Sequence, residues 1–318
     1  MQRRQLLAAT ALLAAAGPAA RAAEPASSLN IFVPAAPGGG WDGLGRAIEL
    51  VARPGGLVQS VQFENLAGGA GTVGLARFVA TRRGRADSLF IGGASLVGPP
   101  IVNRSPLSLA DITPIARMTE EAAVVVVPAD SEFRDMRQLG DALRAEPKGI
   151  PIAGAGGGTV DHVILGLLFK ALGRKPLDAQ FVSFPGGGAT TAAVIGGQVK
   201  AAVAGWGEFS EYVKTGRVRA LATSGERRLS PEVPTLKESG YDVVATNWRG
   251  LFAAPGITAE AKAAHVRFAT ALHALPAWKE LLDTRGWDDA FLTGGTFADF
   301  LARDRKDTEG VLKDLGLA

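Results

Sequence analysis

Apolar segments along the chain alternate with loops rich in glycine, and the first such unit sets the pattern. A short apolar run, 31–33, leads into Pro37 and three consecutive glycines at 38–40. Apolar residues then recur at the spacing of one helix face, as at Leu44 and Ile48. Proline cannot continue strand pairing, and glycine accepts backbone angles that other residues avoid. This stretch therefore predicts a strand, a glycine loop and a helix.

The same order of elements recurs twice in the first third of the chain. The alternating segment 58–65 ends in a loop at 67–74, and the apolar segment 88–93 ends in a loop that contains Ser95. In an open α/β sheet, loops at the carboxyl ends of the strands line the crevice where ligands bind. Three loops of small residues on one edge therefore indicate a ligand site more strongly than any one of them.

A second α/β series follows two extended, β-branched segments at 112–118 and 122–128. Its predicted parts are a helix at 136–145, strands at 150–153 and 180–184, glycine-rich loops at 154–162 and 185–188, and a strand that ends beside Trp206 and Glu208. A further extended segment at 246–253 would return the chain to the first series. A short helix is predicted after Pro234, and long helices are predicted at 258–275 and 296–315.

We therefore predict an α/β protein of two domains, joined by two crossing segments near 122–128 and 246–253. Domain 1 is expected to comprise residues 23–122 and 250–318, because the C-terminal helices would pack back on it. Domain 2 is expected to comprise residues 123–249.

The N-terminus has the features of an export signal. Arg3 and Arg4 precede an apolar run, and the residues Ala20-Arg21-Ala22 are typical of a cleavage site. We expect residues 1–22 to be removed, after export by the general secretory route or, since two arginines are adjacent, by the twin-arginine route. The removed segment holds three of the 34 basic residues and no acidic residue, so the mature chain has 31 of each and a net charge near zero.

This balanced charge, without a basic stripe, predicts no nucleic-acid partner. The chain has no cysteine, which excludes disulfides and thiolate sites. Its three histidines, at 162, 265 and 273, are too scattered to predict a metal site. We expect no cofactor.

Backbone N–H groups of the glycine loops are the candidate ligand donors. Side chains do not screen them, and the helix N-terminus behind such a loop carries about half a positive charge, so a small anion is expected there. Since neither set of loops can surround a ligand alone, we expect both to contact one ligand between the domains. The candidate ligand-binding residues are Gly38, Gly39, Gly40, Trp41, Asp42, Gly69, Ala70, Gly71, Ser95, Gly156, Gly157, Gly158, Thr159, His162, Pro185, Gly186, Gly187, Gly188, Trp206 and Glu208.

Three polar candidates have an alternative role. Asp42 and Glu208 stand at predicted helix starts, where a carboxylate favours the helix dipole and can brace a loop. His162 either satisfies its own loop or contacts the ligand. No residue is predicted to be catalytic, because Ser95 lacks the second glycine of a nucleophile elbow and no motif links it to an acid or base.

Two loops also match the dinucleotide-binding pattern G-x-G-x-x-G, at 38–43 and 69–74, and Glu64 stands where a ribose-binding acid would. Against this reading, Trp41 and Asp42 place bulk and negative charge where a pyrophosphate would approach. The second match has no dinucleotide explanation. An exported NAD(P)-dependent oxidoreductase is therefore the alternative hypothesis.

Five motifs link the loops into a larger pattern. They are PGGGWD (37–42), FEN followed by GGAGTVG (63–74), AGGGTVDH (155–162), FPGGGATTAAVIGGQVKAAVAG (184–205) and VRALATSGERRLSPEVPTLKESGYDV (218–243). On these motifs, the whole mature chain resembles the extracytoplasmic receptors of tripartite tricarboxylate transporters, also called Bug receptors. One departure is Asn65-Leu66-Ala67-Gly68, which stands where the family has Asn-Arg-Pro-Gly, so any role of that arginine is absent here.

The resemblance implies a type II periplasmic binding protein fold. It also implies a periplasmic receptor, not an enzyme, that passes a small carboxylate to the membrane subunits of a transporter. In having a tryptophan after the glycine triplet, here Trp41, the chain resembles the branch of the family that binds tricarboxylates such as citrate. We expect a monomer that closes on its ligand, with the crossing segments as the hinge.

Overall fold

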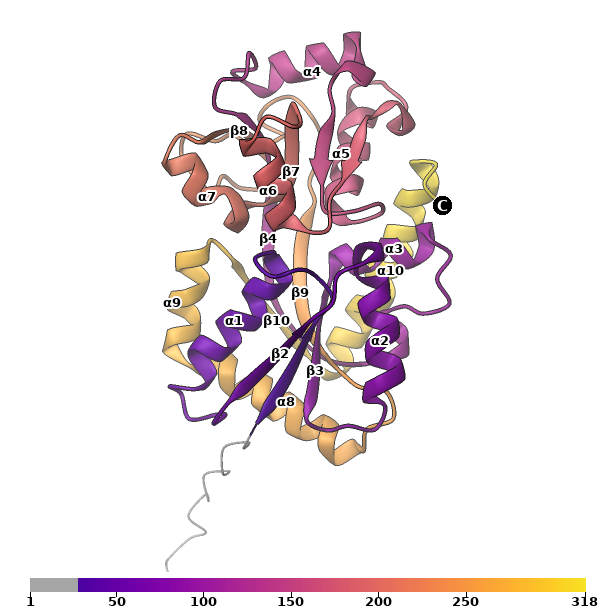
Figure 1. Ribbon diagram of the computed structural model, residues 1–318, viewed down its shortest axis with the longest axis vertical. Coiled ribbons are helices and arrows are strands. Elements are labelled where there is room, and N and C mark those ends of the chain that lie inside the picture. The colour runs from indigo at the N-terminus through magenta and orange to yellow at the C-terminus, as the bar shows by residue number, and fades with distance from the viewer. Residues whose placement is uncertain (1–27) are drawn as a thin grey trace, which may run out of the picture.

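The computed structural model describes residues 28–318, which form two lobes stacked along the long axis of the molecule (Figure 1). Lobe 1 contains segments from both ends of the chain, and lobe 2 contains the middle. The predicted signal peptide at 1–22 lies outside the described residues. In the described part, no helix is long and apolar enough to cross a membrane.

The elements divide between the lobes as follows. Lobe 1 holds β1 (Leu29–Val33), α1 (Gly40–Ala52), β2 (Val61–Asn65), α2 (Thr72–Arg82), β3 (Ser88–Gly93), α3 (Gly98–Val102), β9 (Thr246–Ala253), α8 (Ala259–Ala274), α9 (Pro276–Arg285), β10 (Asp288–Thr293) and α10 (Gly294–Asp314). Lobe 2 holds α4 (Met136–Ala145), β5 (Ile152–Gly154), α5 (Val160–Ala171), β6 (Phe181–Ser183), α6 (Gly187–Ile195), β7 (Ala201–Gly205), α7 (Trp206–Lys214) and β8 (Val218–Thr223). The two lobes share β4 (Thr113–Pro128).

Strand β4 runs through both lobes. It pairs antiparallel with β9 as far as Ala122, and with β7 from Ala123 onwards. It also pairs antiparallel with β10 in lobe 1 and with β8 in lobe 2. The two extended segments that the sequence predicts here are thus one strand of 16 residues. The residue ranges expected for the two domains stay a prediction.

Helices cover both faces of the lobe 1 sheet. Ile31 and Val33 of β1 pack with α1, α8 and α9 in one buried cluster, whereas Phe32 packs with α2 and α10 in another. In the second cluster the rings of Phe32, Phe78 and Phe90 lie 5.0 to 5.8 Å apart. Because successive strand residues face opposite sides of a sheet, a continuous apolar run is what this two-sided burial requires.

Lobe 2 repeats this arrangement around the end of β4. Val125 and Val127 pack with α4 and α5, and Val124 and Val126 pack with α6 and α7. All four side chains are buried. The valine run in the sequence is therefore a central strand covered on both faces.

Parallel pairing brings the glycine loops together. β1 lies between β2 and β3 and is parallel to both, and β5 is likewise parallel to β6 and β7. Loops at the carboxyl ends of parallel strands emerge at the same edge of a sheet. In each lobe this edge faces the other lobe (Figure 1).

The α/β class predicted from the sequence is confirmed, but the C-terminal part differs from the prediction. Helix α9 and strand β10 fill the interval between the two predicted long helices, and neither was expected. The short helix predicted after Pro234 is wrong, because residues 236–240 form turns. Strand β10 pairs antiparallel with β4 and widens the lobe 1 sheet.

Candidate ligand-binding cleft

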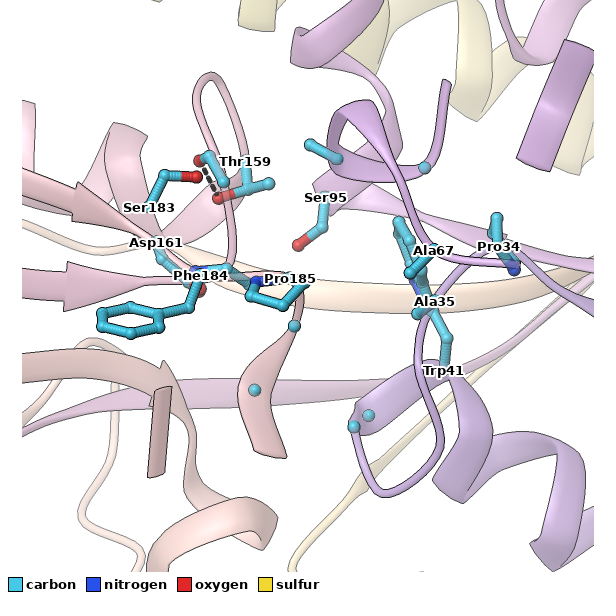
Figure 2. Close-up of a pocket in the computed structure, with 18 of the residues that line it drawn as sticks. Pro34, Ala35, Trp41, Ala67, Ser95, Thr159, Asp161, Ser183, Phe184 and Pro185 are labelled. Atoms are coloured by element: carbon cyan, nitrogen blue, oxygen red, sulfur yellow. Dashed lines mark hydrogen bonds between the residues drawn. The ribbon is translucent and has the colours of Figure 1, made fainter. Parts of the chain in front are cut away.

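A cleft of about 500 Å³ lies between the two lobes. The loops that follow β1, β2 and β3 line it in lobe 1, and the loops that follow β5 and β6 line it in lobe 2. Figure 2 shows Trp41 and Ala67 across the cleft from Thr159 and Pro185, with the hydroxyl of Ser95 pointing into the space between. A small ligand in this space would touch both lobes.

Most of the residues predicted from the sequence line this cleft. They are Gly39, Gly40, Trp41, Gly69, Ala70, Gly71, Ser95, Gly156, Gly157, Thr159, Pro185, Gly186, Gly187 and Glu208. The structure therefore brings candidate residues from five separate loops to one place. Their role in binding stays a prediction.

Six predicted residues do not line the cleft: Gly38, Asp42, Gly158, His162, Gly188 and Trp206. Trp206 is buried with Phe209 in a lobe 2 cluster, and its ring also lies beside Gly286 of lobe 1. Each of the other five is next in sequence to a residue that lines the cleft. The structure places these six outside the lining, and their expected part in ligand binding stays a prediction.

Two of these six brace their own loops. Asp42 accepts hydrogen bonds from the N–H of Gly38 at 3.1 Å and from Asn65 Nδ2 at 3.0 Å. His162 Nδ1 accepts a hydrogen bond from the N–H of Gly158 at 3.2 Å. Burial lowers the pKa of His162, which suits a neutral ring that accepts at Nδ1. Both side chains hold a glycine loop in shape rather than reach into the cleft.

The cleft has free backbone donors on both sides. Within residues 28–318, the N–H groups of Gly39, Gly156, Gly157 and Gly186 have no hydrogen-bond partner. Helices α1, α5, α6 and α7 also begin at the cleft, so the positive ends of four helix dipoles point towards it. Gly156 and Gly186 have φ values of +143° and +130°, which side-chain-bearing residues rarely adopt. This arrangement suits an anion held by backbone donors.

The lobes touch each other around the cleft. A Cβ atom built on Gly156 would lie 2.7 Å from Cβ of Ala70 in lobe 1. A Cβ atom built on Gly98 in lobe 1 would overlap the carbonyl oxygen of Gly158 in lobe 2. Glycine at these positions therefore allows the lobes to approach to backbone contact.

Five polar residues of the lining were missed by the sequence analysis: Asn103, Asp161, Ser183, Asn247 and Arg249. Asp161 occupies the first turn of α5, as Asp42 does in α1, so an aspartate shortly after each run of three glycines was an available signal. Asn247 and Arg249 alternate with apolar residues on β9. Two polar side chains in an otherwise apolar crossing strand could have been singled out.

Ionisable groups gather at the inner end of the cleft. Arg249 on β9 forms an ion pair with Glu121 on β4, and each side chain is at most 2% exposed. Glu208 Oε1 accepts a hydrogen bond of 2.7 Å from the N–H of Gly40, which links lobe 2 to lobe 1. Asp161 Oδ2 accepts one of 2.9 Å from the N–H of Ala155. Three carboxyl groups thus surround a single guanidinium.

This crowding disfavours ionisation of two of the carboxyl groups. Burial, together with the charges of Glu121 and Asp161, raises the pKa of Glu208 to about 8. Burial, together with the charge of Glu121, raises the pKa of Asp161 to about 6. The two groups therefore hold protons more tightly in the folded protein than in the unfolded chain.

These shifts predict that stability falls as the pH rises. A carboxyl group whose pKa is higher in the folded protein than in the unfolded chain contributes its full stabilisation below the unfolded pKa, which is about 4.3 for glutamate. This stabilisation is lost as the pH rises towards the folded pKa. Between pH 5 and 8 we expect the free energy of unfolding of the wild type to fall by about 2 to 4 kcal/mol relative to that of Glu208→Gln, since one pKa unit corresponds to about 1.4 kcal/mol. Urea unfolding at each pH measures this difference.

The matched control is Glu211→Gln, at an exposed position on the same helix. Its stability relative to the wild type should not change over this pH range. A constant difference between the wild type and Glu208→Gln from pH 5 to 8 would contradict the raised pKa of Glu208.

Two α/β lobes joined by paired crossing strands, with a cleft of backbone donors between them, define a two-lobed ligand-binding protein. Residues 48–317 match the model of the tripartite tricarboxylate transporter family receptor, TctC. The match covers most of the chain, and the chain belongs to this family. The family resemblance seen in the sequence is confirmed. The protein is a periplasmic solute-binding receptor and not an enzyme, which excludes the alternative oxidoreductase.

Two curated relatives extend the family assignment. The UPF0065 protein in the tcbD-tcbE intergenic region of Pseudomonas sp. (strain P51) is 32% identical over 73% of this chain and 69% of its own length. The UPF0065 protein in the gbd 5' region of Cupriavidus necator is 28% identical over 68% of this chain. This chain spans slightly less than two thirds of the second relative, at 65% of its length.

Solved structures show the same fold. The periplasmic binding protein BugD matches with a TM-score of 0.83 at 22% identity, over 92% of this chain and 99% of BugD. MatC (Rpa3494) from Rhodopseudomonas palustris, solved with bound malate, matches with a TM-score of 0.79 at 22% identity, over 91% of this chain and 99% of MatC. The prediction of a periplasmic binding protein fold is confirmed.

Proposed function

We propose that the protein binds a small carboxylate, of which citrate is the leading candidate, in the cleft between the lobes. It then delivers this ligand, as a monomer, to the membrane subunits of a tripartite tricarboxylate transporter. The observation that carries the proposal is the set of unpaired N–H groups at Gly39, Gly156, Gly157 and Gly186, which converge from both lobes. Such donors recognise a carboxylate without a charged side chain.

Two further observations support this proposal. The cleft volume of about 500 Å³ is in the range of small-molecule sites and accommodates a dicarboxylate or tricarboxylate. Trp41 follows the glycine triplet and forms part of one wall, as expected from the family resemblance. MatC, a structural neighbour with malate bound, shares this fold.

In this proposal, the predicted domains move as units. Residues 23–122 with 250–318 would form one unit, residues 123–249 the other, and β4 and β9 the hinge between them. A ligand that contacts loops of both lobes would favour the closed form. The difference between its binding free energies for the closed and open forms would set how far the equilibrium shifts.

Replacing Gly157 by valine tests the site with little disturbance of the fold. A Cβ atom at Gly157 meets no atom within 4 Å, and Gly157 lines the cleft, so the new side chain would occupy ligand space. We expect the affinity for citrate or another bound carboxylate to fall roughly tenfold or more, a loss of at least about 1.4 kcal/mol of binding free energy. Calorimetric titration against a panel of dicarboxylates and tricarboxylates measures this loss.

The control is Gly295→Val on the outer surface of α10, where a Cβ atom also meets nothing within 4 Å. Both variants should unfold close to the wild-type temperature, and the control should keep wild-type affinity. Wild-type affinity in Gly157→Val, or a wild type that binds no carboxylate of the panel, would refute the proposed function.

A further inference from the structure

The inner end of the cleft holds two buried carboxyl groups that have no cation of their own within residues 28–318. Asp161 and Glu208 both line the cleft, and neither forms an ion pair within residues 28–318. The nearest cation, Arg249, is already paired with Glu121. A plain carboxylate ligand would add further negative charge beside these two buried carboxyl groups, which is unfavourable unless a donor lies between them.

Several polar side chains at this end of the cleft can also form more hydrogen bonds than they do. Glu208 and Asp161 each accept one hydrogen bond from a backbone N–H, although a carboxylate can accept several. Asn247 lines the cleft and is 8% exposed, and its buried Oδ1 has no hydrogen-bond partner among residues 28–318. Arg249 is 1% exposed, and in the described part of the chain its buried Nε and Nη1 have no hydrogen-bond partner. Unpaired buried polar atoms are rare and indicate a missing partner.

Three glycines hold these groups at the cleft. A Cβ atom on Gly187 would overlap the carboxyl group of Glu208, and one on Gly205 would overlap that of Glu121. A Cβ atom on Gly40 would overlap the guanidinium of Arg249. The side chains are therefore packed against bare backbone of α1, α6 and β7, and have little room to turn away from the cleft.

We infer that this inner subsite selects a carboxylate that also carries a hydroxyl or ammonium group, with Glu208 and Asp161 accepting its hydrogen bonds. The inference rests on the proposed function, because it specifies which carboxylates the cleft prefers. The loop N–H groups bind the ligand carboxylate, and Glu208 and Asp161 accept hydrogen bonds from the neighbouring hydroxyl or ammonium group of the ligand. Sites built to pair a ligand O–H or N–H reject the analogue that lacks it, because their own polar groups are then left unpaired.

The charge state of the subsite agrees with this inference. The pKa of Glu208 is raised to about 8 and that of Asp161 to about 6, by burial and by the charges of neighbouring carboxylates. The groups that face them are Glu121 on β4, Arg249 on β9 and the backbone N–H groups of Gly40 and Ala155. A ligand ammonium would favour ionisation of both carboxyl groups and would release a proton from Glu208 at pH 7.

Matched ligand pairs test this inference directly. Malate and aspartate differ from succinate by one hydroxyl or ammonium group, and citrate differs from tricarballylate by one hydroxyl. In calorimetric titrations of the wild-type chain at pH 7, we expect the donor-bearing member of the pair that fits to bind about tenfold more tightly or better. Glu208→Gln and Asp161→Asn should each reduce this preference severalfold, and Glu211→Gln on the exposed face of α7 should leave it unchanged.

The wild-type comparison decides the inference even if a variant fails to fold, which thermal melting would reveal. Equal affinity within the pairs, or an unchanged preference in both folded variants, would overturn the inference and leave the carboxylate receptor intact. Binding of none of the five acids by the wild type would instead overturn the proposed function, and the inference with it.

Discussion

Replacing Arg249 by methionine is expected to lower the free energy of unfolding by about 3 to 5 kcal/mol at pH 7, the range for removing one partner of a buried ion pair. The guanidinium is the one cation paired within the inner cluster, and its partner Glu121 is 1% exposed. Without it, Glu121 would be left buried without its cation, beside the carboxyl groups of Asp161 and Glu208. Methionine keeps much of the length of the side chain, so the loss reports the charge more than the volume.

Urea unfolding at pH 7 measures this effect, and two controls isolate it. Arg137→Met on the exposed face of α4 should change stability by less than about 0.5 kcal/mol. Combining Arg249→Met with Glu121→Met should recover part of the loss, because both charges of the pair are then removed. An Arg249→Met protein within about 0.5 kcal/mol of the wild type would show that the cluster does not depend on its cation.

Replacing Gly98 by alanine is expected to reduce ligand affinity roughly tenfold or more by obstructing closure. The added Cβ atom on α3 would overlap the carbonyl oxygen of Gly158 in lobe 2. Backbone atoms cannot turn aside as a side chain can, so the lobes must separate to relieve the overlap. Neither Gly98 nor Gly158 lines the cleft, and the substitution therefore leaves the cleft itself unfilled.

Small-angle scattering and calorimetric titration, recorded on the same sample, check this prediction. We expect the ligand-saturated variant to keep a larger radius of gyration than the saturated wild type. Gly310→Ala on α10, where a Cβ atom meets nothing within 4 Å, is the matched control and should behave as the wild type. Unchanged affinity and an unchanged radius of gyration in Gly98→Ala would mean that closure does not depend on this contact.

Local patterns were sufficient to predict most of the fold. Strand β3 and helix α4 occupy the ranges expected from the sequence, 88–93 and 136–145. The two glycines that end β3 mark one boundary. The other is marked by Asp135, the cap of α4, which accepts a hydrogen bond from the N–H of Gln138 at 2.8 Å. Where the hydrophobic periodicity and the residues at the ends of an element predict the same boundaries, contacts with distant residues do not change the element.

The misassigned segments are those whose conformation depends on distant partners. Strand β10 begins with two aspartates and exists because β4 offers it a free edge in lobe 1. After Pro234, Thr235 and Glu238 exchange side-chain to backbone hydrogen bonds, as at a helix start. The chain then turns at Gly240, whose φ of +91° ends the helical path after a single turn.

The candidate site divides in the same way. Glycine loops follow their strands locally, so their convergence could be predicted from the α/β order alone. Arg249 and Asn247 come to the cleft because β9 crosses between the lobes next to β4, a pairing between residues more than 100 positions apart. Trp206 was misplaced since the register of α7, which points it into the lobe 2 core, is set by packing with Phe209 and its neighbours.

Titration of the ¹⁵N-labelled protein with citrate, or with whichever acid of the panel binds, tests the central claim most directly through the backbone amide signals. The account predicts that the signals of Gly39, Gly156, Gly157 and Gly186 shift together at one ligand per chain. These N–H groups lie on both sides of the cleft, and each would donate a hydrogen bond to the same ligand. Saturable binding that shifts amides in one lobe alone, or leaves these four glycines unmoved, would contradict it.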